Sequence, residues 1–143
     1  MGGNGRTKTL RTLTKYGDMW NAFGLPAAVR ELDGVLRRHC EEVGRDEREI
    51  ERSINLWMVI RDSEADARRE WAAWMELNQT PPETTLEPSR TVFGSPETIA
   101  ARLLEYRDAG FRTAIVEMPA PYDRETFERL ALEVRPMVAG KSV

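Results

Sequence analysis

The sequence has few residues of the kinds that form disulfides or bind metals. Cys40 is the single cysteine, so no disulfide can form within the chain, and we expect a reducing compartment, the cytoplasm. One cysteine and one histidine, His39, are too few for a typical zinc site, so no metal is expected.

Long apolar segments and an excess of positive charge are also missing. No apolar run approaches the ~20 residues that cross a bilayer, and the glycine-rich beginning has no apolar core typical of a signal peptide. Lys and Arg number 21 against 24 Asp and Glu, which gives a net charge of −3. Neither a membrane protein nor a nucleic-acid-binding protein is therefore expected.

The residues that are present are typical of one globular α/β domain. Hydrophobic residues make up 41% of the 143 residues, enough for a packed core, and we expect residues 1–143 to form a single domain. Nearly uninterrupted apolar runs predict strands that are buried on both faces, as in a parallel sheet covered by helices. The predicted strands are 18–23, 53–60 and 113–118.

Helical patterns alternate with these runs. Apolar residues three or four positions apart, with capping residues at the ends, predict five helices. These are 6–16, 26–43, 63–77, 96–109 and 123–135, and 80–90 is predicted as a proline-rich loop. The alternation suits right-handed βαβ units, and the chain opens as if it followed one further strand. Four such units would be half of an eightfold β/α barrel, which takes ~250 residues.

The strongest local pattern is the glycine loop, Gly2–Gly5, directly before the first predicted helix. Glycines let the backbone approach an anion closely, and a helix N-terminus adds unpaired N–H groups and a positive dipole end. Arg6 and Lys8 add positive charge nearby. The loop is neither a Walker loop nor a complete dinucleotide fingerprint, so a phosphate cradle and a flexible N-terminus both stay open.

Five segments, in order along the chain, resemble the luciferase-like monooxygenase family. They are Gly2–Leu10 (GGNGRTKTL), Lys15–Asn21 (KYGDMWN), Leu36–Asp46 (LRRHCEEVGRD), Gly94–Ala100 (GSPETIA) and Asp108–Phe111 (DAGF). The family includes flavin-dependent relatives of bacterial luciferase and oxidoreductases that use the deazaflavin coenzyme F-420. The resemblance runs from Gly2 to about Pro136 and implies roughly the last four βα units of a TIM-like barrel, its C-terminal half.

The resemblance also implies a cofactor and a place for it. An oxidoreductase of the monooxygenase type would use FMN or the deazaflavin coenzyme F-420 and act on a small organic substrate. The cofactor phosphate would lie at the glycine loop, in agreement with the rule that barrel phosphate sites form at the carboxyl ends of strands. The residues implied at the phosphate are Gly2, Gly3, Asn4, Gly5 and Arg6. Met19 departs from the family, which usually has glycine at that position.

The first four or so strands of the family have no counterpart in this chain. They normally supply part of the ring pocket and the acid, base or substrate-contacting groups, so no catalytic residue is assigned. Half a barrel would leave two open sheet edges and an exposed apolar face. We therefore expect catalysis to need the missing half, from a homodimer or a partner chain. Two alternatives stay open: a non-catalytic half-barrel module that self-associates, and a generic anion-binding α/β domain with another ligand.

The aromatic residues divide into two groups. Trp20 and Asn21 lie where a barrel strand would meet the cofactor pocket, so both are candidates to line it. Trp57, Trp71 and Trp74 are better explained by core packing than by a ring-stacking box, because their spacing is that of buried strand and helix positions.

The remaining chemically active side chains are given structural roles. His39 is expected to be a solvated helix residue rather than a base, and Cys40 a core residue rather than a nucleophile. Asp123 is predicted to cap a helix, whereas Glu117 is a candidate to line the barrel mouth.

Overall fold

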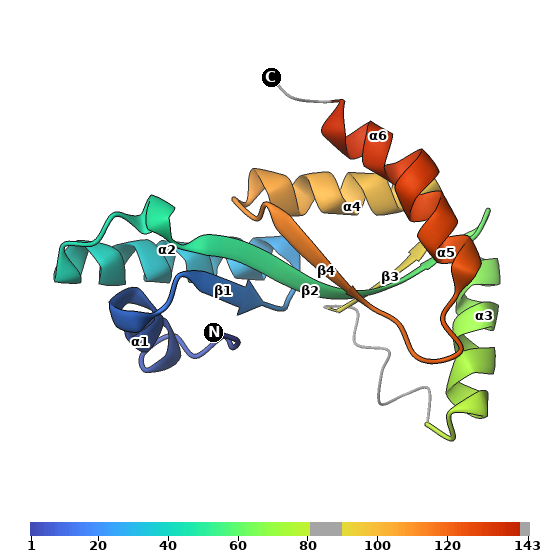
Figure 1. The fold of residues 1–143 in the computed structure, drawn as a ribbon, viewed down its shortest axis with the longest axis horizontal. Helices are drawn as coiled ribbons and strands as arrows, with labels where there is room; N and C mark the ends of the chain where they lie inside the picture. Colours follow the sequence, from blue (N-terminus) through green and yellow to red (C-terminus); the bar gives the residue numbers. More distant parts are fainter. Residues whose placement is uncertain (81–89, 141–143) are drawn as a thin grey trace. The chain divides into compact units, whose positions relative to one another are not determined.

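Strands and helices alternate along the chain in the computed structural model, which describes residues 1–80 and 90–140 (Figure 1). The strands are β1 (Met19–Ala22), β2 (Glu51–Ile60), β3 (Thr91–Gly94) and β4 (Thr113–Glu117). The helices are α1 (Thr9–Tyr16), α2 (Pro26–Val43), α3 (Glu64–Leu77), α4 (Pro96–Asp108), α5 (Arg124–Arg129) and α6 (Arg135–Ala139), with short turns η1 (Glu47–Glu49) and η3 (Leu130–Val134).

The central strand β2 pairs with the other strands. Its first half runs parallel to β1, from the pair Met19 and Glu51 to the pair Ala22 and Ile54. Its second half runs parallel to β3, from Trp57 beside Thr91 to Ile60 beside Gly94, and β4 also pairs with β2. The predicted α/β fold with a parallel sheet and covering helices is confirmed.

The chain divides into two compact units, which are described separately. Unit 1 comprises residues 1–55 and 105–115, and unit 2 comprises residues 56–104 and 116–143. The expectation that residues 1–143 form one domain stays a prediction.

Unit 1 has its core between the strands and the two N-terminal helices. Alternation along β1 puts Trp20 and Ala22 on the fully buried face, while Met19 on the other face is 41% exposed. The Trp20 ring packs against Phe111 with the centroids 5.4 Å apart. The core side chains that α1 and α2 add are Leu10, Leu13, Val29, Leu32, Leu36 and Cys40.

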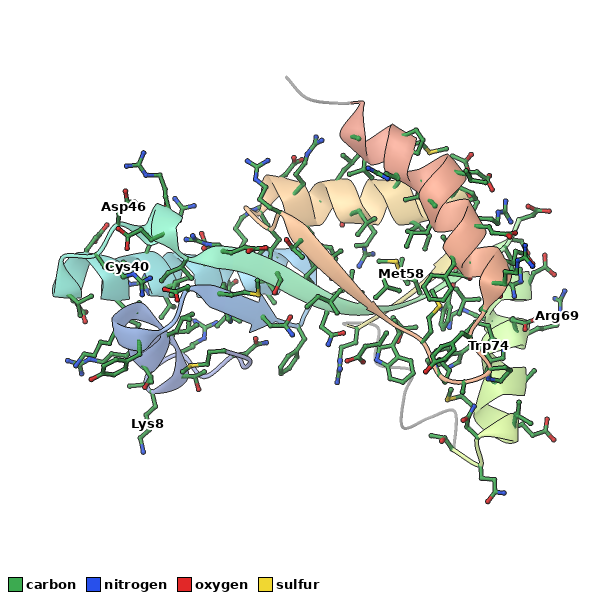
Figure 2. The ribbon with its side chains drawn as sticks, viewed as in Figure 1. Lys8, Cys40, Asp46, Met58, Arg69 and Trp74 are labelled. Atoms are coloured by element: carbon green, nitrogen blue, oxygen red, sulfur yellow. The ribbon has the colours of Figure 1, made fainter. Side chains whose placement is uncertain are left out.

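Unit 2 is organised around an aromatic cluster. Trp71 on α3 has the rings of Trp57, Trp74 and Phe93 at centroid distances of 4.9, 6.1 and 5.8 Å. Trp71 and Trp74 are 1% and 5% exposed, and Trp57 packs against their cluster, so the prediction of core packing is confirmed. Arg69, on the same helix, projects away from the cluster (Figure 2).

Several predicted boundaries were wrong. The first helix begins at Thr9 rather than Arg6, because residues 6–8 form a turn. Pro136 does not end the last helix. Instead the N–H of Arg135 donates to the carbonyl of Leu130, a wider turn that places Pro136 at the start of α6, where a proline needs no N–H partner. Strand β3 was not predicted, and of the predicted loop 80–90 only the two end residues lie within the described part.

Within residues 1–80 and 90–140, no helix is long and apolar enough to cross a membrane. The same residues contain no group of three or more side chains arranged to hold a metal ion.

Candidate functional site

The glycine loop lies beside the carboxyl end of β1, in unit 1. Gly2 forms a parallel bridge with Asn21, and the N–H of Gly3 donates to the carbonyl oxygen of Asn21 at 3.2 Å. On the same edge, the N–H of Asn21 donates to the carbonyl oxygen of Met1 at 2.9 Å. The loop therefore leaves a parallel strand edge at the end where the phosphate hypothesis requires it.

Two side chains from other segments, and one from the loop itself, fix the backbone of the loop and of Arg6. The indole N–H of Trp20 donates to the carbonyl oxygen of Gly3 at 3.0 Å. The side-chain Nδ2 of Asn4 donates to the carbonyl oxygen of Phe23, and Oδ1 of Asn4 accepts from the N–H of Phe23 at 3.5 Å. His39 Nε2 lies 2.9 Å from the carbonyl oxygen of Arg6. A carbonyl oxygen only accepts, so Nε2 carries the proton in this contact.

After Gly3, the backbone N–H groups have no such partners. Among the described residues, none of the five backbone N–H groups from Asn4 to Lys8 forms a hydrogen bond with a protein acceptor. Helix α1, which begins next, has no side-chain cap and no acidic residue in its first turn. By contrast, Ser63 caps α3 and Asp123 caps α5. The start of α1 thus offers donors and a positive dipole end that can bind an anion.

Two of the glycines are required by the local geometry. Gly3 has φ +125°, a conformation that other L-residues rarely adopt. A Cβ on Gly5 would lie 2.5 Å from Oγ1 of Thr9, so any side chain there collides with the first residue of α1. Gly2 is less constrained, because its Cβ would meet only the carbonyl oxygen of Asn21, at 3.9 Å.

The positive side chains beside the loop are exposed, and Arg6 pairs with an acidic side chain. Arg6 pairs with Glu31 at 3.2 Å, and both side chains are largely exposed, at 59% and 70%. Such a surface pair stabilises little and is exchanged easily for a stronger anion. Lys8 is exposed and points outward at the turn before α1 (Figure 2). The implied contact of Arg6 with a phosphate stays a prediction.

The two residues predicted to line a cofactor pocket lie on opposite faces of β1. Trp20 is fully buried and holds the loop through the hydrogen bond from its indole N–H to the carbonyl oxygen of Gly3. Asn21 is half-buried, and its Oδ1 lies 3.4 Å from the hydroxyl of Ser53 on β2. Asn21 therefore shares the face of β1 that carries the partly exposed Met19, opposite Trp20.

His39 has a role that the sequence did not indicate. The prediction of a solvated residue was wrong, because its side chain is only 15% exposed and touches the backbone of Arg6. Glu42 Oε2 lies 3.3 Å from Nδ1. The contact joins residues 33 positions apart and uses a backbone oxygen, so no spacing in the sequence could have revealed it.

The other candidates take structural positions. Cys40 is 1% exposed, and burial raises the pKa of its thiol, which confirms it as a core residue. Asp123 accepts a hydrogen bond from the N–H of Thr126 and caps α5, as predicted. Glu117 lies 3.6 Å from Arg90 in an ion pair, and its place at a barrel mouth stays a prediction.

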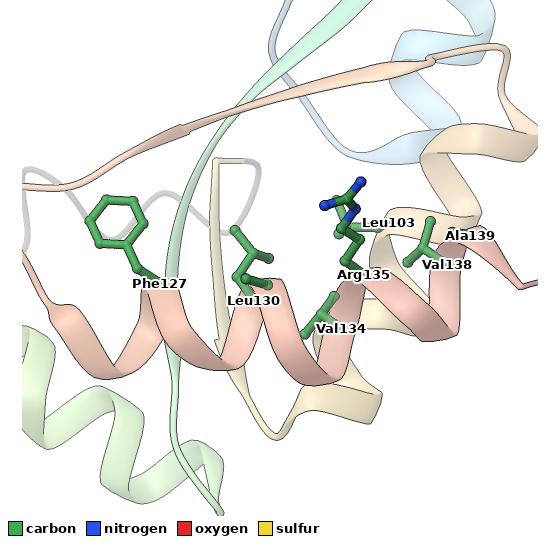
Figure 3. Close-up of a pocket in the computed structure, with 8 residues that line it drawn as sticks. Leu103, Phe127, Leu130, Val134, Arg135, Val138 and Ala139 are labelled. Atoms are coloured by element: carbon green, nitrogen blue, oxygen red, sulfur yellow. The ribbon is translucent and has the colours of Figure 1, made fainter.

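Unit 2 contains an apolar pocket of about 470 Å³ (Figure 3). Its lining comes from α4 and the run from α5 to α6: Leu103, Phe127, Leu130, Ala131, Val134, Arg135, Val138 and Ala139. Such walls suit an apolar group and lack the convergent donors that a phosphate needs. The glycine loop is therefore the candidate site for an anion.

Comparison with known proteins supports the fold. The sequence matches no protein-family model, and it matches no curated protein. Solved structures do match. One is an F420-dependent secondary alcohol dehydrogenase in complex with an F420-acetone adduct, with a TM-score of 0.74 and 15% identity over 96% of this chain and 47% of that one.

Two further structures lead to the same conclusion. The coenzyme F420 dependent tetrahydromethanopterin reductase from Methanopyrus kandleri matches with a TM-score of 0.68 and 18% identity, over 95% of this chain and 49% of that one. The oxygenating constituent of 3,6-diketocamphane monooxygenase from Pseudomonas putida, in complex with FMN, matches with a TM-score of 0.64 and 16% identity, over 96% and 47%.

These similar structures are luciferase-like enzymes with TIM-barrel folds, so the resemblance predicted from the sequence is confirmed at the level of the fold. The chain spans less than half the length of each of these three proteins.

Proposed function

We propose that this chain is the phosphate-binding half of a flavin- or deazaflavin-dependent oxidoreductase. The glycine loop and the start of α1 would receive the phosphate of FMN or of coenzyme F-420. The observation that carries the proposal is the run of five backbone N–H groups, Asn4 to Lys8, without a protein acceptor among the described residues. Support comes from structural neighbours, one in complex with FMN and one with an F420-acetone adduct.

The residues present fit a phosphate. A phosphate oxygen accepts hydrogen bonds from backbone N–H groups, and the uncapped N-terminus of α1 adds a favourable dipole. Gly3 and Gly5 allow close approach, and no acidic side chain in the first turn of α1 repels the anion. Lys8 and Arg6 add attraction from the surface.

The bound cofactor would supply the hydride-transfer or oxygen chemistry, and the role of this chain would be to hold and orient it. Asn21, on the partly exposed face of β1, would lie toward the cofactor. Trp20, on the opposite face, would hold the loop in place. No residue of the chain is assigned to acid–base catalysis, so turnover of a small organic substrate would need the other half of the barrel. The single buried Cys40 suits a reducing cytoplasm.

Thermal unfolding with paired ligands tests the proposal. FMN is compared with riboflavin, which lacks the phosphate, and coenzyme F-420 with its phosphate-free deazaflavin. A ligand at 100 times its Kd stabilises the native state by about 2.7 kcal/mol, which raises Tm by several degrees. We expect the phosphate-bearing member of one pair to raise Tm more than its partner does. No shift with any of the four at millimolar concentration would contradict the proposal.

A second candidate function, self-association of half barrels, is favoured by exposed apolar side chains of unit 1. Met19 on β1, Phe23 directly after β1 and Ile115 on β4 are 41%, 40% and 38% exposed, and exposed apolar surface can serve as a protein–protein contact. A second copy or a chain with the missing half would cover them. Light scattering separates the two cases: a dimer supports self-association, and a monomer at all concentrations contradicts it.

A further inference from the structure

We infer that Trp20 and His39 are positioning residues. They turn backbone N–H groups of the glycine loop, and of the turn directly after it, outward for a phosphate. This inference rests on the proposed function and goes beyond it, because it assigns phosphate selectivity to two side chains that need not touch the ligand. Each donates a hydrogen bond to a backbone carbonyl. Trp20 donates to Gly3 in the loop, and His39 donates to Arg6, directly after the loop.

The geometry of the peptide bond links these carbonyls to the N–H groups. In a trans peptide unit the C=O and the N–H point in opposite directions, and the peptide bonds of the loop are trans. When Trp20 holds the Gly3 carbonyl inward at 3.0 Å, the N–H of Asn4 must point outward. The Trp20 ring is itself fixed, because it is fully buried against Phe111.

The same argument applies to the next peptide units. His39 holds the Arg6 carbonyl at 2.9 Å, which directs the N–H of Thr7 outward. Between these two points, the Gly5 carbonyl accepts from the N–H of Leu10 at 3.0 Å, so the N–H of Arg6 also points outward. Two side chains and one helix amide thus orient three N–H groups within four residues.

A site prepared in this way favours a phosphate over a neutral group. N–H groups that are already oriented do not pay the entropy of ordering when the anion binds, and hydrogen bonds to a charged acceptor are the stronger kind. Without either side-chain donor, the carbonyl that it holds could rotate, and the adjacent N–H group would lose its fixed orientation. Affinity for a phosphate-bearing ligand would fall, while affinity for a ligand without phosphate would change little.

The test measures the dissociation constants of FMN and riboflavin for the full chain and its variants by flavin fluorescence. Trp20→Phe keeps an aromatic ring against Phe111 and removes the N–H. His39→Phe keeps a ring and removes both nitrogens, whereas His39→Gln keeps a donor of similar reach. Trp74→Phe is the control, because it removes an indole N–H that bonds Glu70 in unit 2. The same measurements are made with coenzyme F-420 and its phosphate-free deazaflavin.

We expect Trp20→Phe and His39→Phe to weaken binding of the phosphate-bearing ligand about five- to tenfold, the effect of one lost hydrogen bond. The phosphate-free ligand should change less than about twofold, His39→Gln should resemble the parent, and Trp74→Phe should leave the ratio of the two constants unchanged.

The outcomes separate this inference from the proposed function. If the parent chain does not prefer the phosphate-bearing ligand of either pair, the proposed phosphate site is wrong, and the positioning role falls with it. If the parent chain has the preference but both ring variants keep it, or lose affinity for both ligands equally, only the positioning role is overturned. Should Trp20→Phe not fold, the pair His39→Phe and His39→Gln decides alone.

Discussion

Arg52 on β2 and Asp33 on α2 form an ion pair in the core of unit 1, with Nε of Arg52 2.9 Å from Oδ1 of Asp33 and side chains only 8% and 6% exposed. The guanidinium also donates to the backbone carbonyls of Glu47 and Ile50. Arg37 donates to the second carboxylate oxygen of Asp33 at 2.7 Å. Buried charges are tolerated only with such complete pairing, so this pair fixes the beginning of β2 to α2.

Removing one partner of this pair should destabilise the fold strongly. Asp33→Ala removes the buried one of the two carboxylates that pair with the Arg52 guanidinium and leaves only Glu47, so we expect it to lower the free energy of unfolding by about 1–3 kcal/mol. Arg48→Ala is the matched control, because its pair with Asp46 is exposed, at 83% and 41%, and its loss should change the stability much less. Urea unfolding measures both, and equal effects would contradict the assigned role of the buried pair.

Arg52 also explains where the sequence predicted the fold well and where it did not. The apolar run from Ile54 to Ile60 predicted the strand, but β2 begins at Glu51, because Arg52 is buried by pairing and not by hydrophobicity. Strand β3 was not predicted, because it has only four residues and is defined by its pairing with Trp57–Ile60, which the sequence alone does not reveal. Helix α2 was predicted in full, because Pro26 and Gly44 mark its ends locally.

The candidate site was predicted in part for the same reason. The glycine loop could be read from the sequence, since glycines and a following helix are local signals. Its supports could not, because Trp20 and His39 act on backbone oxygens that every residue carries. Only the folded chain brings His39 to Arg6.

Replacing Gly5 should disturb both the loop and its ligand. The Cβ of Gly5→Ala would lie 2.5 Å from Oγ1 of Thr9 and 3.1 Å from its Cβ, so the Thr9 side chain or the loop must shift. We expect a loss of about 1–3 kcal/mol in stability and at least about tenfold in affinity for the phosphate-bearing cofactor. Gly2→Ala is the control, because its Cβ meets nothing closer than 3.9 Å. Calorimetric titration checks both, and unchanged phosphate-ligand affinity in Gly5→Ala would mean that the site lies elsewhere.

Asp123 should make the stability of unit 2 sensitive to acid. Burial pushes the pKa of Asp123 upward, but hydrogen bonds from Arg61 and Thr126 outweigh burial and hold that pKa below its ordinary value. The carboxylate therefore stabilises the native state fully above the unfolded pKa, and this stabilisation is lost as the pH falls through the lower folded pKa. The sensitive window lies below about pH 5.

Asp123→Asn should remove this pH dependence. We expect it to cost about 1–3 kcal/mol at neutral pH, because the ion pair with Arg61 at 2.9 Å is broken, and to cost progressively less as the pH falls. Unfolding curves from pH 7 to about pH 3 compare the two proteins over the window that linkage defines. Parallel curves at all pH values would contradict the role given to Asp123.

Cys40 should react with thiol reagents only when unit 1 opens. It is 1% exposed, and burial raises its thiol pKa, so both access and the thiolate fraction are low in the native state. We expect labelling to be slower than in the unfolded chain by a factor on the order of 10³ or more. Since Cys40 is the single cysteine, one reagent reports on one site. Labelling at the unfolded rate without denaturant would show that α2 does not pack as described.

Arg45 should stabilise α1 from its far end without selecting the ligand. Its guanidinium donates to the carbonyl oxygens of Gly17 at 2.7 Å, Thr14 at 3.2 Å and Leu13 at 3.4 Å, at the C-terminal end of α1. The Leu13 carbonyl also accepts the N–H of Gly17, so Arg45 adds to the backbone cap of this helix end. Arg45→Met removes these donors and should lower the free energy of unfolding by about 1–3 kcal/mol.

The control for Arg45 is Arg38→Met on the exposed surface of α2, where we expect a change within about 0.5 kcal/mol. Because Arg45 acts at the opposite end of α1 from the glycine loop, the ratio of FMN to riboflavin affinity should stay that of the parent chain. Chemical denaturation and fluorescence titration on the same samples measure the two effects. A changed ratio would mean that the orientation of the loop depends on the whole of α1, and not only on Trp20, His39 and the N–H of Leu10.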